Sequence, residues 1–461
     1  MSLILKNALI IYSAICVILA SRLVDASLSI STTKTIQGDK PTFTPEIEEN
    51  INNFVLFGLN YTDPDTLNTV SYYDNSDISN IGVRGSYPFY DLFSIAPIKQ
   101  PTEDQYANID GDLFKELIAS SALTMQWFYT NVSGQEVLFT PSKSDTFCNL
   151  YSAGKEGPYK VKIFGDLVLR SHYGDPSENT YPNETVSTQP SITYTILNDP
   201  GICYAKPALT PSTALGVSAS QWDAKSGFLI QSLNSPEKNF PSTGFYGAKF
   251  DLLLAKSGLA ANYDWSITKG SELVNISVDS SGVHLVFNKI AASSTDLYWN
   301  YIMSTDGYEV VVEGIHRTKG YSIKYPFKLT KWFSGWSKAN LDNATIGYRG
   351  DAKEIIQGCA SLSGKYKISE ASHVSNAPYN TASSGVSYTR EVGTLLGEWG
   401  YLSQDNYPGS WGAKESQANS YSRIWLYDTN LGEYCDLHLY NSKYHCISEA
   451  GNKNGVCIAT N

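Results

Sequence analysis

Two cysteines near the end of this chain have histidines beside them, in a spacing that could hold zinc. Cys435-x-x-His438 and His445-Cys446 place two thiolates and two imidazoles within twelve residues, and these are the ligands zinc prefers. The competing chemistry is disulfide formation. Six of the seven cysteines lie outside the predicted signal peptide of residues 1–26, and an even number in an exported chain is typical of paired thiols. We expect pairing to win, and we expect no metal and no cofactor. The predicted disulfide cysteines are Cys148, Cys203, Cys359, Cys435, Cys446 and Cys457.

Two further short motifs could either bind a ligand or have a purely structural role. Arg349-Gly350-Asp351 is an integrin ligand when it is displayed at a loop tip, but here it stands where a helical pattern begins. Asp351 is therefore expected to cap that helix, with Glu354 completing a capping box. Asp110-Gly111-Asp112 resembles the start of a calcium loop, yet the later ligands are missing, so a turn is expected.

Signatures of catalysis are missing from the sequence. It contains no Gly-x-Ser-x-Gly elbow, no His-Glu-x-x-His pair and no glycine-rich phosphate loop. Its six histidines are scattered. A Ser-His-Asp site assembled from distant residues would leave no local pattern, but nothing in the sequence points to one, and we expect no enzyme.

Aromatic residues concentrate in the tail, where they suggest a binding surface. Trp and Tyr are favoured at the energetic centres of interfaces, whereas core packing is the alternative and is expected for Trp425. Residues 407–411 have a loop-like composition and are the predicted surface contact. The predicted binding residues are Tyr401, Tyr407, Trp411 and Tyr421.

These groups must be positioned mainly by strands. Short segments with alternating apolar residues recur between turn residues, a pattern typical of β-sandwiches. Cys148 and Cys203 fall among the first of these strands and are expected to bond to each other. The candidate strands are residues 125–129, 159–164, 166–171, 191–196, 250–254, 273–278, 283–287, 309–315 and 321–327.

The last 120 residues change character. Helical spacing is predicted over 351–362 and 392–399, followed by strands near 422–427, 436–440 and 444–447. The aromatic residues of 331–336 are expected to pack against this α+β unit and stiffen the joint that leads into it.

Composition limits the partners. The formal net charge is −11, which disfavours nucleic acid. Residues 1–26 have a positive charge, a short apolar run and small residues before position 27, as in a signal peptide. No later segment is long and apolar enough to cross a membrane as a helix, and none resembles the strands of a membrane barrel. An exported protein without direct membrane insertion is therefore expected.

Several blocks of the chain resemble intimin/invasin-like bacterial adhesins. Residues 359–366 (CASLSGKY) and 388–400 (YTREVGTLLGEWG) resemble the two helices of the C-terminal module, and 425–446 is similar to its closing hairpin. Upstream, 221–228 (QWDAKSGF) and 239–247 (NFPSTGFYG) resemble the preceding β-domain, and 170–176 and 200–207 the one before it. The blocks span roughly residues 120–461, and their combination is more specific than any one of them.

This resemblance implies a mainly β fold with five segments. Tandem immunoglobulin-like β-sandwich domains are followed by a C-terminal α+β C-type-lectin-like domain. The calcium-binding Glu-Pro-Asn and Trp-Asn-Asp motifs of true lectins are missing, so protein binding without calcium is expected. The predicted segments are a signal peptide (1–26), a β-rich N-terminal region (27–115), two immunoglobulin-like domains (116–215 and 216–340) and the lectin-like domain (341–461).

The resemblance also bears on the tail disulfides. It implies a bridge from the first helix to the last strand, Cys359–Cys446, which leaves Cys435 to pair with Cys457. The nested alternative, Cys359–Cys457 with Cys435–Cys446, is similar to animal C-type lectins. We favour the first pairing.

The best-known members of the family carry an outer-membrane barrel at the N-terminus, and no such barrel is expected in this sequence. It looks most like passengers exported separately, such as the Zir-type secreted proteins of enteric bacteria. The resemblance then implies a partner outer-membrane barrel as exporter, a host surface protein as possible receptor, and a secreted or surface-displayed, virulence-modulating adhesin. The alternative is an accessory structural protein that docks to a barrel or adhesin of the same cell. A secreted hydrolase, the third class, would require a polar cleft with a convergent catalytic group.

Overall fold

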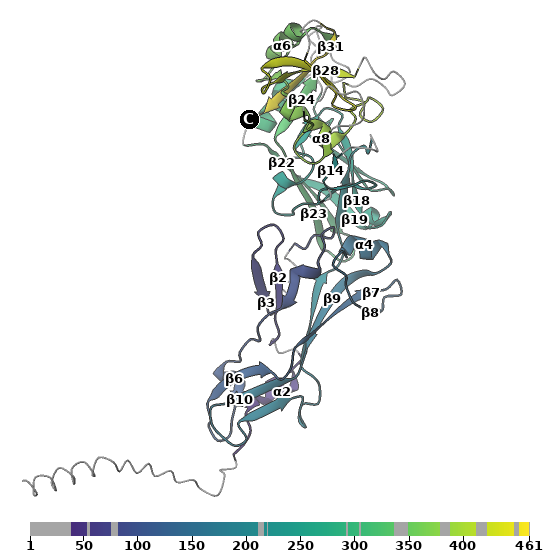
Figure 1. The fold of residues 1–461 in the computed structure, drawn as a ribbon. Helices are drawn as coiled ribbons and strands as arrows, with labels where there is room; N and C mark the ends of the chain where they lie inside the picture. Colours follow the sequence, from purple (N-terminus) through teal and green to yellow (C-terminus); the bar gives the residue numbers. More distant parts are fainter. Residues whose placement is uncertain are drawn as a thin grey trace, which may run out of the picture. The chain divides into compact units, whose positions relative to one another are not determined.

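The computed structural model describes residues 38–52, 56–74, 82–210, 216–218, 220–291, 294–303, 306–335, 349–378, 388–411, 422–446 and 451–460. Strands make up most of its regular structure (Figure 1), so the predicted mainly β class is confirmed. The predicted signal peptide lies outside the described residues. Within the described part, no helix is long and apolar enough to cross a membrane.

The chain forms two compact units that do not follow the predicted linear boundaries. The first combines the segment up to Ile51 with Gln100–Ser120 and Asp166–Gln189, and the second contains Asn52–Lys99, Ser121–Gly165 and Pro190–Asn461. Strand pairing explains why the units differ from the predicted domains, because strands far apart in the sequence pair in one sheet, as β6 (Phe114–Ala119) does with β10 (Leu167–Ser171). Sequence periodicity identifies the strands but does not show which of them are neighbours.

The first unit contains a three-stranded antiparallel sheet in the order β11-β10-β6 and the short pair β1-β5. The Tyr181 ring lies 5.0 Å from that of Phe43, and its hydroxyl donates to Glu48 Oε1 at 2.6 Å. The elements of this unit are β1 (Thr42–Phe43), α2 (Pro45–Glu49), η2 (Glu103–Gln105), β5 (Tyr106–Ala107), β6 (Phe114–Ala119), β10 (Leu167–Ser171) and β11 (Glu178–Tyr181).

The second unit begins with two packed sheets, in the orders β3-β2-β4 and β12-β9-β7-β8. Trp127 of β7 is buried and contacts Phe89, Phe93 and Phe147. The elements are β2 (Leu59–Thr62), β3 (Thr69–Tyr72), η1 (Tyr90–Leu92), β4 (Phe93–Ile95), β7 (Thr124–Thr130), β8 (Glu136–Phe139), α4 (Phe147–Ser152), β9 (Glu156–Phe164) and β12 (Ser191–Leu197).

A second pair of sheets follows in the same unit. The six-stranded sheet β15-β16-β13-β18-β21-β20 shares a core with the sheet β19-β22-β23, where Leu252 and Val312 are fully buried. The elements are β13 (Ile202–Lys206), β14 (Gly216–Val217), β15 (Trp222–Asp223), β16 (Gly227–Leu229), η3 (Pro236–Lys238), β17 (Thr243–Phe245), β18 (Lys249–Leu254), η4 (Leu259–Asn262), β19 (Tyr263–Lys269), β20 (Asn275–Val278), β21 (Val283–Val286), α5 (Thr295–Met303), β22 (Tyr308–His316), β23 (Ser322–Leu329) and β24 (Lys331–Gly335).

Helix α5 is a departure from the expected all-β domain. Tyr298 of this helix stacks on Trp332 of β24, with ring centroids 4.3 Å apart. The segment has three aromatic residues within four positions, Tyr298, Trp299 and Tyr301, a composition that suits a strand as well as a helix. Helix α5 packs against β24 and β32, and this tertiary packing stabilises the helix. Most helices in proteins are stabilised by such packing more than by the local preference of their residues.

The C-terminal segment adds helices and a five-stranded sheet, in the order β25-β31-β28-β29-β30. Asp351 accepts a hydrogen bond from the Glu354 backbone nitrogen and Glu354 reciprocates, so the predicted capping box is confirmed. The elements are β25 (Arg349–Gly350), α6 (Ala352–Ser361), β26 (Lys367–Ile368), α7 (Ala371–Val374), β27 (Thr389–Arg390), α8 (Leu395–Trp399), β28 (Arg423–Asp428), β29 (Glu433–His438), β30 (Tyr444–His445), β31 (Lys453–Asn454) and β32 (Val456–Thr460).

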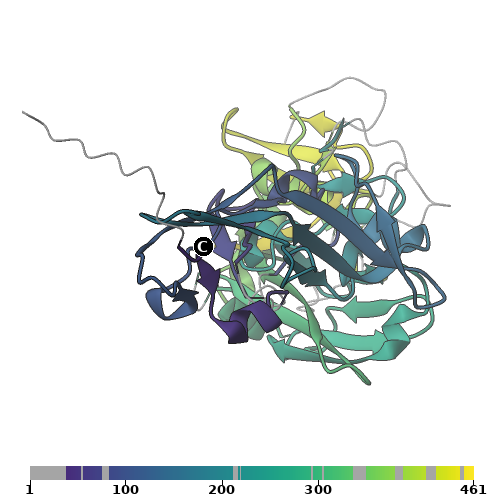
Figure 2. The ribbon, with the colours of Figure 1, turned by 90° about the horizontal axis from the view of Figure 1, so that it is seen from below.

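One sheet contains strands from both sides of the predicted domain boundary at 340/341. Strand β24 pairs in parallel with β17 and antiparallel with β32, which also pairs with β26. Figures 1 and 2 show the green and yellow segments of the chain together in this part of the second unit. Strand β14 pairs with β27 across the same boundary. The aromatic residues Trp332 and Phe333 are buried in this joint, as predicted, while Trp336 lies outside the described residues. Described residues on both sides of this boundary, from Ile202 to Ala459, therefore share one hydrophobic core.

Candidate functional site

The predicted aromatic contact surface is not on the surface. Tyr401 is 3% exposed, Trp411 1% and Tyr407 fully buried, so the prediction of a surface contact at 407–411 is wrong. Tyr421 lies outside the described residues. Trp425, assigned to the core, is buried and donates from Nε1 to the Gly350 carbonyl.

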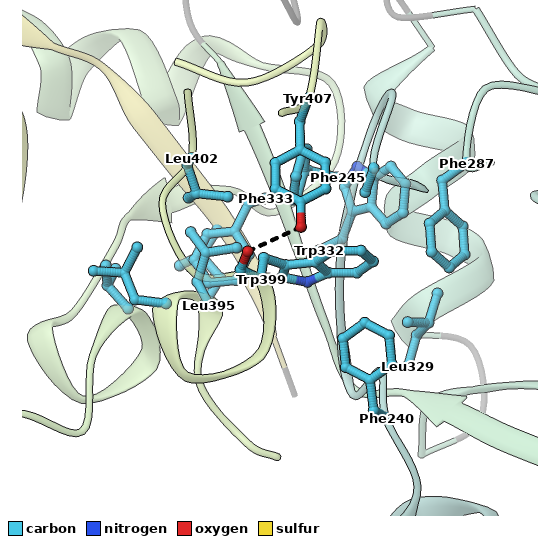
Figure 3. Packing of buried hydrophobic residues seen from close by; sticks show 14 of the residues in the cluster. Phe240, Phe245, Phe287, Leu329, Trp332, Phe333, Leu395, Trp399, Leu402 and Tyr407 are labelled. Atoms are coloured by element: carbon cyan, nitrogen blue, oxygen red, sulfur yellow. Dashed lines mark hydrogen bonds between the residues drawn. The ribbon is translucent and has the colours of Figure 1, made fainter. Parts of the chain in front are cut away.

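The physical reason is the shared core between the last two predicted domains. Figure 3 shows Tyr407 pointing at Trp399. The Tyr407 hydroxyl donates a hydrogen bond to the backbone oxygen of Trp399, with the two oxygens 2.9 Å apart. The Phe245 ring of β17 lies 5.4 Å from those of Trp399 and Trp411. Tyr407 and Trp411 would be exposed if the C-terminal segment folded by itself. In this chain they are covered by residues of the predicted second immunoglobulin-like domain, such as Phe245.

A buried carboxylate reinforces this joint. Glu398 of α8 is fully buried and accepts hydrogen bonds from the backbone nitrogens of Ser242 and Thr243, at 2.9 Å each. Both hydroxyls add a hydrogen bond at 2.5 Å, and the Gly393 nitrogen donates at 2.9 Å. A buried charge is tolerated when its lone pairs are satisfied in this way.

The six predicted cysteines form three disulfides, and the preferred tail pairing is wrong. Cys148–Cys203 is present as predicted, but the tail contains Cys359–Cys457 and Cys435–Cys446. Strand β32 carries Cys457 and pairs with β26, just after the helix that carries Cys359. Cys435 and Cys446 lie on or beside the paired strands β29 and β30. Strand pairing thus selects the nested alternative, which also consumes both thiols of the possible zinc site.

The Arg349-Gly350-Asp351 motif is held within the fold. Residues 349 and 350 form β25, paired with β31, and the Asp351 carboxylate caps α6. Arg349 donates to the Asn452 carbonyl at 2.6 Å. The motif therefore has the structural role expected of it.

A cleft of about 770 Å³ lies within the second unit. It combines apolar walls with hydroxyl, amide and charged groups, the usual composition of a ligand site. None of its lining residues was predicted, because the segments that meet there are far apart in sequence. The lining residues are Pro64, Asp65, Arg84, Ser86, Tyr87, Pro88, Thr146, Ser220, Gln221, Leu229, Ile230, Gln231, Glu237, Lys238 and Val392.

Charged groups inside the cleft are preorganised. Arg84 is 8% exposed, lies 3.2 Å from Asp65 Oδ1, and has its guanidinium 4.5 Å from the Tyr87 ring centre. Lys238 Nζ lies 4.0 Å from the same Asp65 oxygen. With Glu237, the lining holds two cations and two carboxylates. Such a balance suits a polar ligand without net charge.

One cleft group is left unsatisfied. Ser86 is 6% exposed and, among the described residues, its hydroxyl has no hydrogen-bond partner. A buried polar group without a partner costs about 1–3 kcal/mol. A ligand with a donor or acceptor at this position would recover part of that cost.

A Ser-His-Asp arrangement occurs elsewhere, between the hairpin β20–β21 and the neighbouring strand β18. His284 Nδ1 lies 2.7 Å from Asp251 Oδ1, and Nε2 lies 3.3 Å from Ser281 Oγ. These are the contacts of a hydrolase triad, but Asp279 Oδ1 lies 2.9 Å from Nε2 and accepts the Ser281 proton at 2.6 Å.

Two carboxylates therefore favour the protonated form of this histidine. Burial alone would lower the pKa of His284, but the hydrogen bonds to Asp279 and Asp251 raise it. A protonated imidazole has no lone pair with which to activate the serine. The trio is an ion-pair network, and sequence reasoning missed it because Asp251 is thirty-three residues from His284.

No protein-family model and no curated protein matches this chain. Solved structures similar to it include an intimin–Tir90 complex, with 12% identity over 48% of this chain and 88% of the other, at a TM-score of 0.23. Protocadherin gamma B7 cadherin domains 1–4 match at 14% identity over 44% and 40%, with a TM-score of 0.16. Titin immunoglobulin tandem domains A164–A165 match at 11% identity over 45% and 80%, with a TM-score of 0.13. Similarity this low establishes no family.

Proposed function

We propose that this chain is an exported, non-enzymatic binding protein of the adhesin type, which engages a partner at a host or bacterial surface. The cleft of about 770 Å³ is the observation that carries the proposal, because an unsatisfied hydroxyl and preorganised charges converge in it. Three disulfides suit an oxidising compartment outside the cytoplasm. The sequence resemblance to intimin/invasin-like passengers supports the same role.

The ligand suggested by the cleft is a protruding polar segment of a partner protein. The lining is charge-balanced and offers Ser, Thr and Gln side chains that both donate and accept. One wall of the cleft is anchored to the shared core, because Ile230 belongs to that core and Val392 packs against it. Preorganisation of this kind reduces the entropy lost on binding.

The test measures retention of the labelled full-length mature chain on host cells and on the producing bacterium. Tyr87→Ala with Glu237→Lys alters the cleft at two accessible positions, and we expect about a tenfold loss of retention, as for an interface anchor. Tyr90→Ala is the matched control, since Tyr90 is 42% exposed against 37% for Tyr87 and does not line the cleft. Unchanged retention of the cleft variant would overturn the assignment of the site.

Cell fractionation separates the main proposal from its alternative. Accumulation in the medium that depends on one outer-membrane barrel, together with host-cell retention, is the expected result. Retention only on the producing cell would favour the accessory structural role. A chain that stays in the periplasm whatever barrel is present would contradict the passenger function.

A further inference from the structure

Exposed apolar side chains gather at one end of the first unit. Among the described residues, no large apolar side chain is more exposed than Ile109, at 87%, while Tyr173 is 70% and Leu113 65% exposed. The Leu113 carbonyl accepts a hydrogen bond from the His172 nitrogen at 2.9 Å, which brings the segment that carries Tyr173 beside Leu113. A single exposed apolar residue needs no explanation, but a group of them is typical of a binding surface.

A hollow of about 390 Å³ is part of this surface, because Ile109 and Leu113 line it. Two aromatic rings belong to its wall, since Tyr106 of β5 and Phe114 of β6 also line it, with ring centroids 5.5 Å apart. The hollow therefore offers a ligand both aliphatic and aromatic contacts. Its other lining residues are Glu103, Ala107, Asn108, Gly111 and Asp112.

The charge of the hollow has one sign. Glu103 and Asp112 line it, whereas none of its lining residues, all of which the structure describes, is a lysine, arginine or histidine. Ion pairs within the described part of the first unit join Arg170 to Glu116 and Glu178. They leave the carboxylates of Glu103 and Asp112 without a paired cation among those residues, so a ligand has to bring the positive charge.

Hydrogen bonds fix the position of Asp112 before any ligand arrives. Its backbone nitrogen donates to Asn108 Oδ1 at 3.1 Å, and its carbonyl accepts from the Tyr106 hydroxyl at 2.9 Å. A Cβ added to Gly174 would lie 2.6 Å from Asp112 Oδ2, so the carboxylate lies next to the segment that carries Tyr173. A charge held in place in this way reduces the entropy lost on binding.

An arginine side chain has the chemistry that this hollow selects. Its methylene groups suit apolar walls, and its planar guanidinium stacks on aromatic rings and pairs with carboxylates. A small free cation would leave Ile109 and Leu113 exposed, whereas apolar residues beside the arginine would cover them. In an extended segment, residues two positions apart share a face. An anionic membrane surface is disfavoured, because the carboxylates would repel it.

We propose that this hollow and its apolar rim bind an arginine that a partner protein presents between two apolar residues of an extended segment. The site belongs to the first unit and shares no lining residue with the cleft of the second unit. It therefore goes beyond the function proposed above and does not depend on the cleft. The formal net charge of −11 favours the approach of a basic partner.

The experiment titrates a fluorescently labelled peptide, Leu-Ser-Arg-Ser-Leu, with the full mature chain and follows fluorescence anisotropy. A second peptide carries citrulline in place of arginine, which keeps the size of the side chain and removes its charge. We expect saturable binding of the arginine peptide that weakens as salt is raised. The citrulline peptide should bind about tenfold more weakly.

Variants locate the binding. Glu103→Gln with Asp112→Asn should lower the affinity for the arginine peptide by about tenfold, because it removes both charges and keeps the side-chain size. Glu49→Gln with Glu184→Gln is the matched control, since it removes two exposed carboxylates of the same unit that do not line the hollow; it should bind like wild type. Ile109→Ser, at an exposed position that should tolerate the change, should lower the affinity by about fivefold.

Several results would overturn the proposal. The first is a lack of saturable binding, and the second is equal binding of the two peptides, a comparison made on the wild-type chain that depends on no variant. Equal affinities of the carboxylate variant and its matched control would also overturn it. A dimer in sedimentation velocity that Ile109→Ser abolishes would assign the surface to a second copy of this chain instead. The cleft variant Tyr87→Ala with Glu237→Lys should bind the peptide like wild type, so each of the two proposals is able to fail alone.

Discussion

Glu398 Oε2 lies 2.9 Å from the backbone nitrogen of Thr243, although 155 residues separate them. The carboxylate is fully buried and accepts hydrogen bonds from Ser242, Thr243 and Gly393. This contact ties α8 to β17 and makes the last two predicted domains a single body. A receptor-binding fragment that began at residue 341 would lack β24, the partner of β32.

Replacing Glu398 should destabilise this body. In Glu398→Gln an NH₂ group takes the place of one acceptor oxygen and faces donors, so we expect a loss of about 2–4 kcal/mol in the free energy of unfolding. Urea denaturation followed by tryptophan fluorescence measures it. Glu433→Gln, at an exposed position of β29, should change stability by less than about 0.5 kcal/mol. Equal effects of the two substitutions would contradict the role of Glu398.

Tyr407 should behave as a core residue. Its hydroxyl donates to the Trp399 carbonyl and accepts from the Ala208 nitrogen, both at 2.9 Å. Tyr407→Phe leaves those two backbone groups without their partner and should cost about 1–3 kcal/mol. Tyr173→Phe, at a position 70% exposed, is the control and should be neutral. If Tyr407→Phe left stability intact and weakened cell retention, Tyr407 would be a contact residue after all.

The tail disulfides differ in the chain length that they close. Cys359–Cys457 spans 98 residues and Cys435–Cys446 spans 11. A longer loop removes more entropy from the unfolded chain, so replacing the first pair by serine should cost about 1–2 kcal/mol more than replacing the second. Peptide mapping without reduction is the accompanying check. Recovery of a Cys359–Cys446 peptide would restore the pairing implied by the resemblance.

His284 should make stability depend on pH. Its pKa is raised in the folded protein by Asp279 and Asp251, against the effect of burial, and the pKa of Asp279 is lowered by Ser281 and His284, so Asp279 stays ionised. The stabilisation is therefore complete below the ordinary histidine pKa of about 6.5. It is lost as pH rises through the raised value in the folded state.

The melting temperature of wild type relative to His284→Gln measures this dependence. We expect the wild-type advantage at about pH 5.5, below the ordinary histidine pKa, and its decline as the pH is raised through the higher pKa of the folded state. His316→Gln is the control, because no described ion pair involves His316. An advantage that grew with pH would show that the histidine is neutral and would reopen the triad interpretation.

Local pattern was enough to predict much of the secondary structure. Alternating apolar residues identified β9, β12 and β22, and Asp351 with Glu354 located the start of α6. Helix α5 was missed because packing on Trp332, and not local preference, supports it. The cleft was missed entirely, since Ser86 and Lys238 lie far apart in the sequence and line the same cleft only in the folded chain.

The sequence by itself determined the class of the fold, the capping of α6, the pairing of Cys148 with Cys203 and the acidic character of the chain. Periodicity, caps and charge are properties of neighbouring residues, so they are visible without a fold. Only the tertiary structure decided that β24 joins β32, that Tyr407 and Trp411 are buried, and which tail cysteines meet. Each of these depends on long-range strand pairing, whose register comes from the burial of whole faces and has no local signal.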